Sequence, residues 1–280
     1  SNIKIIAMAV ISYTLFFEFI GFIILTLAWL PHFGFAKSSF YALFYSISAF
    51  NNAGFSLYGN SLMGFQHNIP LLLTISFLYI LGGLGFVVLL DIKKQRKWKK
   101  LSPNSKLILI GVLALNIVAF LLIWIIEARN MSTLGQLSII EQITHAWFQA
   151  TVPRSSGFNS IDTSSLSTAS TFLTMILMFI GGGSLSTAGG IKIGTFIILI
   201  LSVITFLRRQ DELVIFNHSV SHEQVFKALA VTAITSMFIM LGIFILLALE
   251  PKHRFIDIIF EVISAACTVG LSRGITGQLH

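Results

Sequence analysis

The sequence reads Asn51-Asn52-Ala53-Gly54-Phe55-Ser56 directly after a short apolar run, and this polar stretch centred on a glycine decides the fold. The arrangement recurs as Arg154-Ser155-Ser156-Gly157-Phe158-Asn159 and as Thr268-Val269-Gly270-Leu271-Ser272, each time after another apolar run. A cation leaves water only where a ring of oxygens replaces its hydration shell, and one chain builds such a ring from repeated copies of one loop. The sequence therefore predicts an ion pore.

The composition is typical of a polytopic membrane protein. Of 280 residues, 55% are hydrophobic and 10% are charged, and several uninterrupted apolar runs are long enough to span a bilayer. The formal net charge of +7 would suggest a nucleic-acid partner for a soluble chain, but the basic residues concentrate in two short linkers, so we expect no nucleic acid. The single cysteine, Cys267, excludes a disulfide within the chain and a cysteine metal cluster.

The first structural unit is predicted over residues 1–100. A helix over 3–30 should end at Pro31, because proline lacks the backbone N–H group and its ring clashes with the preceding turn. The apolar run 38–50 is too short to cross ~30 Å of hydrocarbon at ~1.5 Å per residue, so it should enter the membrane and turn back. A second spanning run covers 69–90 and closes the unit.

The same unit is predicted again over 101–210 and, in part, over 211–280. The second copy has a spanning helix, a short helix and a long apolar stretch, and the third has a spanning helix and a short helix: 106–126, 139–151, 166–207, 225–249 and 255–267. The fold class is therefore an all-α polytopic membrane protein, built from repeats of helix, re-entrant pore helix, filter loop and helix.

The basic residues predict the orientation. Most lysine and arginine side chains lie at Lys4 and in the linkers 93–106 and 208–227. Positively charged linkers stay on the cytoplasmic side, so the glycine-centred loops should face outward from the plasma membrane.

The three loops have the chemistry of a cation filter. Non-helical backbone at membrane depth must line water or lie inside protein, and glycine adopts positive φ without strain, which lets a loop turn its carbonyl groups toward one axis. Thr268-Val269-Gly270 also repeats a tripeptide of the potassium-channel filter. The predicted filter residues are Asn52, Ala53, Gly54, Ser156, Gly157, Phe158, Thr268, Val269 and Gly270. The alternative is that the loops are ordinary turns between helices.

A second polar stretch interrupts the long apolar run 166–207. It should break the helix into two halves at membrane depth, where it could obstruct permeation and move aside. The predicted gating residues are Gly181, Gly182, Gly183, Ser184, Ser186, Thr187, Gly189, Gly190 and Lys192. The alternative is close helix packing through small residues.

A few ionisable residues are candidates for roles near the loops. Glu18 lies inside an apolar helix, where it is either functional or part of an interhelical contact. Glu261 could orient the third loop or pair with Arg273 or Arg154. No combination of nucleophile, base and orienting residue is present in the sequence, so we expect no enzyme.

The motifs together resemble a known family. Ser48 to Ser56, Arg154 to Asn159, Gly182 to Lys192 and Thr268 to Ser272 are similar to the Trk/Ktr/HKT superfamily of potassium transporters, most closely its bacterial Ktr members, over nearly the whole chain. The resemblance implies four repeats around one pseudo-fourfold pore. This sequence then looks like the second repeat, the third repeat and the first half of the fourth.

The resemblance further implies the ion and the partners. K⁺ would bind at the backbone carbonyls of Gly54, Gly157 and Gly270, with Na⁺ as the alternative ion, and the stretch at 182–192 would be the gate. The implied partners are membrane lipid, a second copy in a homodimer, and a cytosolic nucleotide-binding regulatory ring of the KtrA or TrkA type.

Two other functions remain open from the residues. Discontinuous helices also occur in ion-coupled secondary transporters of small solutes. A membrane subunit of an assembly or signalling complex, without transport, would show the same apolar helices.

Overall fold

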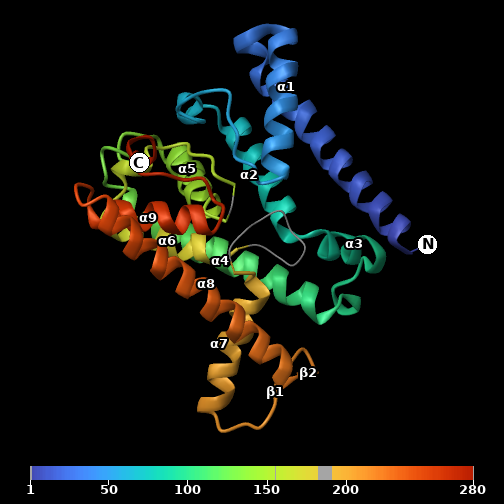
Figure 1. Ribbon diagram of the computed structural model, residues 1–280. Helices are drawn as coiled ribbons and strands as arrows, with labels where there is room; N and C mark the ends of the chain where they lie inside the picture. Colours follow the sequence, from blue (N-terminus) through green and yellow to red (C-terminus); the bar gives the residue numbers. More distant parts are fainter. Residues whose placement is uncertain (1, 155, 182–190, 280) are drawn as a thin grey trace.

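The computed structural model describes residues 2–154, 156–181 and 191–279, and these residues are predominantly α-helical (Figure 1). The helices are α1 (Asn2–Phe50), α2 (Ile69–Leu84), α3 (Phe86–Gln95), α4 (Pro103–Glu127), α5 (Ile139–Thr151), α6 (Thr168–Phe179), α7 (Ile193–Leu207), α8 (His222–Leu249) and α9 (Phe255–Ala266). Short elements are the 3-10 turns η1 (Met63–Phe65), η2 (Trp98–Lys100), η3 (Thr163–Ser165) and η4 (Thr276–Gln278), and the strands β1 (Leu213–Ile215) and β2 (His218–Val220).

The long helices have the length and apolar composition of membrane spans. Among the described residues, α1, α4 and α8 each contain a window hydrophobic enough to cross a bilayer, and α2 with α3 does so as a bent pair. Their outer faces expose large aliphatic and aromatic side chains, which only a lipid environment or a protein partner would cover. The predicted all-α polytopic membrane fold is confirmed.

Helix α1 reverses direction inside its own length (Figure 1). Pro31 lies within the helix, and the break comes three residues later at Gly34, which has φ 76° and ψ 172°. The prediction that the helix ends at Pro31 is therefore wrong by a few residues. A helix can tolerate the loss of the one backbone hydrogen bond that proline cannot make. The φ and ψ values at Gly34, in contrast, cause little steric strain only for glycine. The returning limb, residues 35–50, is the short helix expected before the first loop.

Helices α2 and α3 meet at a bend of 90°. Gly85 forms the corner with φ 94° and ψ 146°, so the spanning run expected over 69–90 is two helices joined at a bend. Three residues earlier, a methyl group on Gly82 would overlap the carbonyl oxygen of Phe50. Gly82 thus lets α2 approach the end of α1, and Gly85 turns the chain away from it.

The stretch 166–207 is divided into α6 and α7, which confirms the predicted break. The two ends at the break lie side by side: the Gly181 N–H donates to the Ile191 carbonyl at 2.5 Å, and the Ile191 N–H donates to the Phe179 carbonyl at 2.9 Å. These bonds satisfy backbone groups that the ends of the two helices would otherwise leave unpaired.

The linker between α7 and α8 forms a small antiparallel hairpin that the sequence analysis did not anticipate. Strands β1 and β2 are joined by Phe216 and Asn217, which have φ values of 49° and 62°. Two adjacent positive φ values make the tight turn that matches strand twist. Leu213 and Ile215 pack on Leu107 of α4 and hold the hairpin against the bundle.

The main core lies where both limbs of α1 meet α2, α5, α6 and α9. Its largest buried side chains are aromatic, among them Trp29, Tyr45, Phe50, Phe148 and Phe260. Aromatic rings bury large areas, so this core anchors the three short helices that precede the glycine-centred loops.

Candidate functional site

Each glycine-centred loop follows the carboxyl end of a short helix. The first loop (51–56) follows the returning limb of α1, the second loop (154–159) follows α5, and the third loop (268–272) follows α9. The carboxyl end of a helix carries partial negative charge, so the chain places three such ends next to three polar loops.

The same backbone motif closes the helices before the first and third loops. In each, the N–H one residue before the glycine donates to a serine carbonyl: Ala53 to Ser48 at 2.9 Å, and Val269 to Ser264 at 2.8 Å. The preceding residues, Asn52 and Thr268, have left-handed φ values of 52° and 55°. This Schellman motif satisfies the last helical carbonyls and turns the chain toward the glycine.

The three glycines lie against one another although more than a hundred residues separate each from the next. A methyl group added to Gly157 would lie 3.5 Å from the Cα of Gly54 and 3.6 Å from the Cα of Gly270. All three have positive φ, at 70°, 73° and 86°. The structure thus brings the loops to one place, with Gly157 between the other two.

Backbone oxygens face this meeting point. A methyl group on Gly157 would lie 2.5 Å from the carbonyl oxygen of Val269, and one on Gly54 would overlap the carbonyl oxygen of Ser156. Both oxygens belong to the residue directly before a loop glycine. The surroundings leave no room for side chains at Gly54 and Gly157, so backbone carbonyls are the groups available to a cation there.

The side chains of the predicted filter residues mostly point elsewhere. Asn52, Ser156, Phe158 and Val269 are buried, whereas Ala53 and Thr268 are exposed. Phe158 packs on Tyr45 with ring centroids 6.1 Å apart. The four buried side chains therefore pack inside the protein and support the loop backbone.

The donor set suits a monovalent cation. Within the described part of the chain, no three His, Cys, Asp or Glu side chains lie together in a way that could hold a metal ion. Neutral carbonyl oxygens replace the weak hydration shell of a large monovalent ion, whereas divalent ions in proteins usually recruit carboxylates.

The predicted gating stretch is described only at its ends. Gly181 is buried and bonded to Ile191, and Lys192 caps the amino end of α7. Gly182, Gly183, Ser184, Ser186, Thr187, Gly189 and Gly190 lie outside the described residues.

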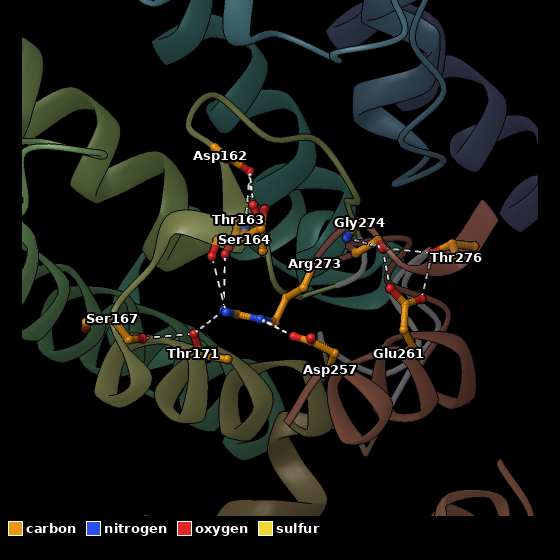
Figure 2. A network of polar contacts seen from close by, with 11 residues as sticks. Asp162, Thr163, Ser164, Ser167, Thr171, Asp257, Glu261, Arg273, Gly274 and Thr276 are labelled. Atoms are coloured by element: carbon orange, nitrogen blue, oxygen red, sulfur yellow. Dashed lines mark hydrogen bonds and ion pairs between the residues drawn. The ribbon is translucent and has the colours of Figure 1, made fainter. Parts of the chain in front are cut away.

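Arg273 ties the third loop to the second structural unit (Figure 2). Its Nε donates to Asp257 Oδ1 at 2.8 Å, and its Nη1 donates to Thr171 Oγ1 at 2.6 Å. The two terminal nitrogens also donate to the carbonyls of Thr163 at 3.3 Å and Ser164 at 3.2 Å. A buried guanidinium with this many partners fixes the chain that leaves the third loop.

The second loop is tied to the first in a comparable way. The N–H of Asn159 donates to Ser61 Oγ at 3.2 Å, and the N–H of Leu62 donates to the Asn159 carbonyl at 3.1 Å. Each later loop thus docks on the segment that follows the loop before it.

Two of the open questions about ionisable residues are answered. Glu261 accepts hydrogen bonds from Ser272 and Thr276, which fits the alternative that it orients the third loop. The alternative pairing with Arg273 is not observed, because Arg273 pairs with Asp257. Glu18 accepts a bond of 2.8 Å from Asn51 Nδ2, so it makes the interhelical contact that was the alternative to a functional role.

Arg154, the first residue of the second loop, is buried. A cavity of about 20 Å³ next to it is lined by Tyr79 and Thr151, among others. Among the described residues, Arg154 Nη1 has no hydrogen-bond partner. The cavity is large enough for one water molecule, which would supply the missing acceptor.

Asp162, between α5 and α6, and Glu141, in the first turn of α5, are held ionised. Burial alone would raise the pKa of Asp162, but the hydrogen bonds from Ser164 and Ser165 outweigh it and lower the pKa. A hydrogen bond from His67 at 2.9 Å lowers the pKa of Glu141.

Sequence reasoning missed the residues that support the loops from behind. Asn52 was predicted as a filter residue but not as the left-handed residue that ends a helix, although asparagine there is a usual signal. Tyr45 and Ser56, which bond to each other, lie at spacings from Gly54 that match Glu261 and Ser272 around Gly270.

The chain is similar in sequence to known potassium uptake proteins. The chain is 46% identical to the Ktr system potassium uptake protein B of Bacillus subtilis (strain 168), over 94% of this chain and 59% of that protein. It is 38% identical to the protein of the same name from Vibrio alginolyticus, over 99% of this chain and 61% of that protein. It is 36% identical to the potassium/sodium uptake protein NtpJ of Enterococcus hirae, over 96% of this chain and 60% of that protein. The chain spans about three fifths of the length of these relatives.

A solved structure shares the fold. The crystal structure of the potassium transporter TrkH from Vibrio parahaemolyticus matches with a TM-score of 0.74 at 17% identity, over 89% of this chain and 53% of that one. The family model TrkH, described as a cation transport protein, matches residues 1–280. With that match across the whole sequence, the chain belongs to the TrkH family of cation transport proteins.

Proposed function

We propose that this chain forms part of a channel-like pore for potassium uptake across the plasma membrane, with its basic linkers in the cytoplasm. Two relatives are named potassium uptake proteins and a third is named a potassium/sodium uptake protein. The apolar helices supply the membrane-spanning frame. The unequal distribution of lysine and arginine supports the orientation.

The adjacency of the three loop glycines carries the proposal. In it, K⁺ binds at the backbone carbonyls of Gly54, Gly157 and Gly270, and the remaining filter positions hold those carbonyls in place. A pocket of neutral oxygens at a site with three helix carboxyl ends favours a monovalent cation. Na⁺ is the alternative ion, as the printed name of one relative suggests for that protein.

In the same proposal, the stretch 181–192 is the gate. Its ends are joined by the backbone bond from the Gly181 N–H to the Ile191 carbonyl, next to the start of α7. Deletion of 182–190 should then raise uptake, because it would remove the obstruction. Lower or unchanged uptake would contradict the gating role.

The units and partners are proposed on the same basis. The segments 1–100, 101–210 and 211–280 correspond to the second, third and part of the fourth repeat of a pseudo-fourfold pore. Partners are a second copy of the chain, a cytosolic nucleotide-binding ring and membrane lipid. The name Ktr system, carried by two relatives, supports further subunits.

The test is ⁸⁶Rb⁺ uptake in bacterial cells that lack their own potassium uptake systems. Gly157→Ala places a methyl group against the Val269 carbonyl and forces a left-handed residue, so uptake should fall at least about tenfold, the equivalent of ~1.4 kcal/mol. Gly59→Ala is the matched control, because a methyl group there meets nothing within 4 Å. Normal uptake by Gly157→Ala, at a normal amount of protein in the membrane, would refute the filter.

A further inference from the structure

The chain segments that leave the first and third loops are built alike. Ser56 and Ser272 each stand two residues after the loop glycine. Ser56 Oγ accepts from the N–H of Tyr58 at 3.2 Å, and Ser272 Oγ accepts from the N–H of Gly274 at 2.9 Å. Both serines therefore close the same small turn with the residue two positions later.

Each of these serines is bonded to the same position of the preceding helix. Tyr45 and Glu261 stand nine residues before Gly54 and Gly270. The Tyr45 hydroxyl lies 2.5 Å from Ser56 Oγ, and Ser272 Oγ donates to Glu261 Oε1. One contact thus spans each loop, from the helix that enters it to the segment that leaves it.

Further bonds reinforce both contacts. The Tyr45 hydroxyl accepts from the N–H of Leu57 at 3.0 Å. Glu261 Oε2 accepts from Thr276 Oγ1 at 2.7 Å, on the same side of α9 (Figure 2). Tyr45 is 0% exposed and Glu261 is 8% exposed, so water competes weakly for these groups.

The second loop has no equivalent contact at these positions. Phe148 and Asn159 occupy them, and a phenylalanine ring offers no hydrogen-bonding group to an asparagine amide. A different pair spans this loop: His145 Nδ1 lies 2.8 Å from Ser160 Oγ, one turn earlier on the helix and one residue later on the leaving segment.

We propose that Tyr45 and Glu261 are positioning residues that set the discrimination between K⁺ and Na⁺ by fixing the width of the first and third loops. The inference rests on the proposed function above. A ring of backbone carbonyls is soft, and a small loss of constraint lets the oxygens close around a smaller ion. A hydrogen bond across the loop resists that closure without touching the ion.

The two contacts differ in charge, so comparing them distinguishes an effect of the hydrogen bond from an effect of charge near the loop. Glu261 can carry a negative charge beside the third loop, whereas Tyr45 holds the first loop with a neutral hydroxyl. If the contact is what matters, Tyr45→Phe and Glu261→Ala should have the same kind of effect. Glu261→Gln keeps an acceptor oxygen and should restore part of the function.

The experiment measures ⁸⁶Rb⁺ uptake and its inhibition by Na⁺ in cells, with the amount of protein in the membrane determined in parallel. Tyr45→Phe and Glu261→Ala should each lower the selectivity for Rb⁺ over Na⁺ about fivefold, the equivalent of ~1 kcal/mol. Ser272→Ala removes the same bond from the other side together with the turn to Gly274, so the double variant with Glu261→Ala should lose less selectivity than the two single losses combined. Tyr13→Phe is the control, because within the described chain the Tyr13 hydroxyl has no hydrogen-bond partner.

A second measurement does not depend on flux. K⁺ should raise the melting temperature of the purified protein more than Na⁺ does, and this difference should shrink in Tyr45→Phe and Ser272→Ala but not in Tyr13→Phe. Wild-type selectivity and wild-type K⁺-dependent stabilisation in the variants would overturn the inference while leaving the proposed function intact. A wild-type protein with neither Rb⁺ uptake nor K⁺-dependent stabilisation would overturn both.

Discussion

The first and third loops are held at the place where the three glycines meet by the same kind of contacts, and the second loop is held there by different ones. The first and third share a Schellman motif and a serine bonded to the preceding helix. The second has a buried arginine, a histidine contact and the central glycine of the three. The three loops share the position and the positive φ of one glycine. The backbone at that glycine is therefore constrained, whereas the side chains that hold each loop in place differ.

The largest expected effect distinguishes the glycines themselves. A methyl group on Gly54 or Gly157 would collide with a carbonyl oxygen of the neighbouring loop, whereas one on Gly270 comes no closer than 3.7 Å to the Cα of Gly157. Gly54→Ala and Gly157→Ala should therefore abolish ⁸⁶Rb⁺ uptake, and Gly270→Ala should reduce it through backbone strain alone, worth ~1–2 kcal/mol. Equal uptake by all three variants would show that crowding between loops is unimportant.

A smaller effect is expected from the arginine that only the second loop carries. Arg154→Met removes a buried positive charge near the proposed cation site, which should lower the concentration of Rb⁺ for half-maximal uptake about fivefold, the equivalent of ~1 kcal/mol. Arg129→Met, at an exposed arginine, is the control. A weaker apparent affinity in Arg154→Met would mean that this arginine supports the loop more than it repels the ion.

The left-handed residues before the glycines, Asn52 and Thr268, allow a finer comparison of the first and third loops. Thr268 is β-branched and strained at φ 55°, whereas Asn52 tolerates this region well. Thr268→Gly should raise the free energy of unfolding by ~1 kcal/mol, and Asn52→Gly should not, because it also loses the bond from Asn52 Nδ2 to the Tyr79 carbonyl. Thermal unfolding in detergent measures both, and stabilisation of Asn52→Gly but not of Thr268→Gly would contradict the assignment.

The smallest effect concerns the amino end of α5, the helix before the second loop. Glu141→Gln removes the ion pair with His67, which lies near the surface and should cost at most ~1 kcal/mol. The pKa of Glu141 is lowered in the folded protein, so its contribution is present above the ordinary pKa of ~4.3 and is lost as the pH falls through the folded value. Melting curves at pH 6 and pH 3.5 should therefore differ less for Glu141→Gln than for wild type.

Much of this fold follows from the sequence, for reasons that particular residues illustrate. Apolar length predicted the spans, and the repeated polar loop predicted where Gly54, Gly157 and Gly270 would fall relative to the short helices. The break at Gly34 instead of Pro31 and the corner at Gly85 were missed, because a glycine in an apolar helix reads equally well as a packing contact.

The hydrogen-bond partners of Arg273 could not be predicted from sequence patterns either. Its choice of Asp257 over Glu261 depends on where α9 places two carboxylates that lie four residues apart, and on carbonyls supplied by a distant loop. Residues four apart lie on one face of a helix, so their spacing does not show which of the two carboxylates meets the arginine.

The ties between successive loops also bear on how the protein is made. Asn159 docks on Ser61 and Leu62, and Arg273 docks on Thr163 and Ser164, so every docking surface is encoded upstream of the segment that uses it. A ribosome delivers these surfaces in the same order. Membrane insertion can therefore complete the assembly stepwise, each newly released segment settling onto one that has already emerged.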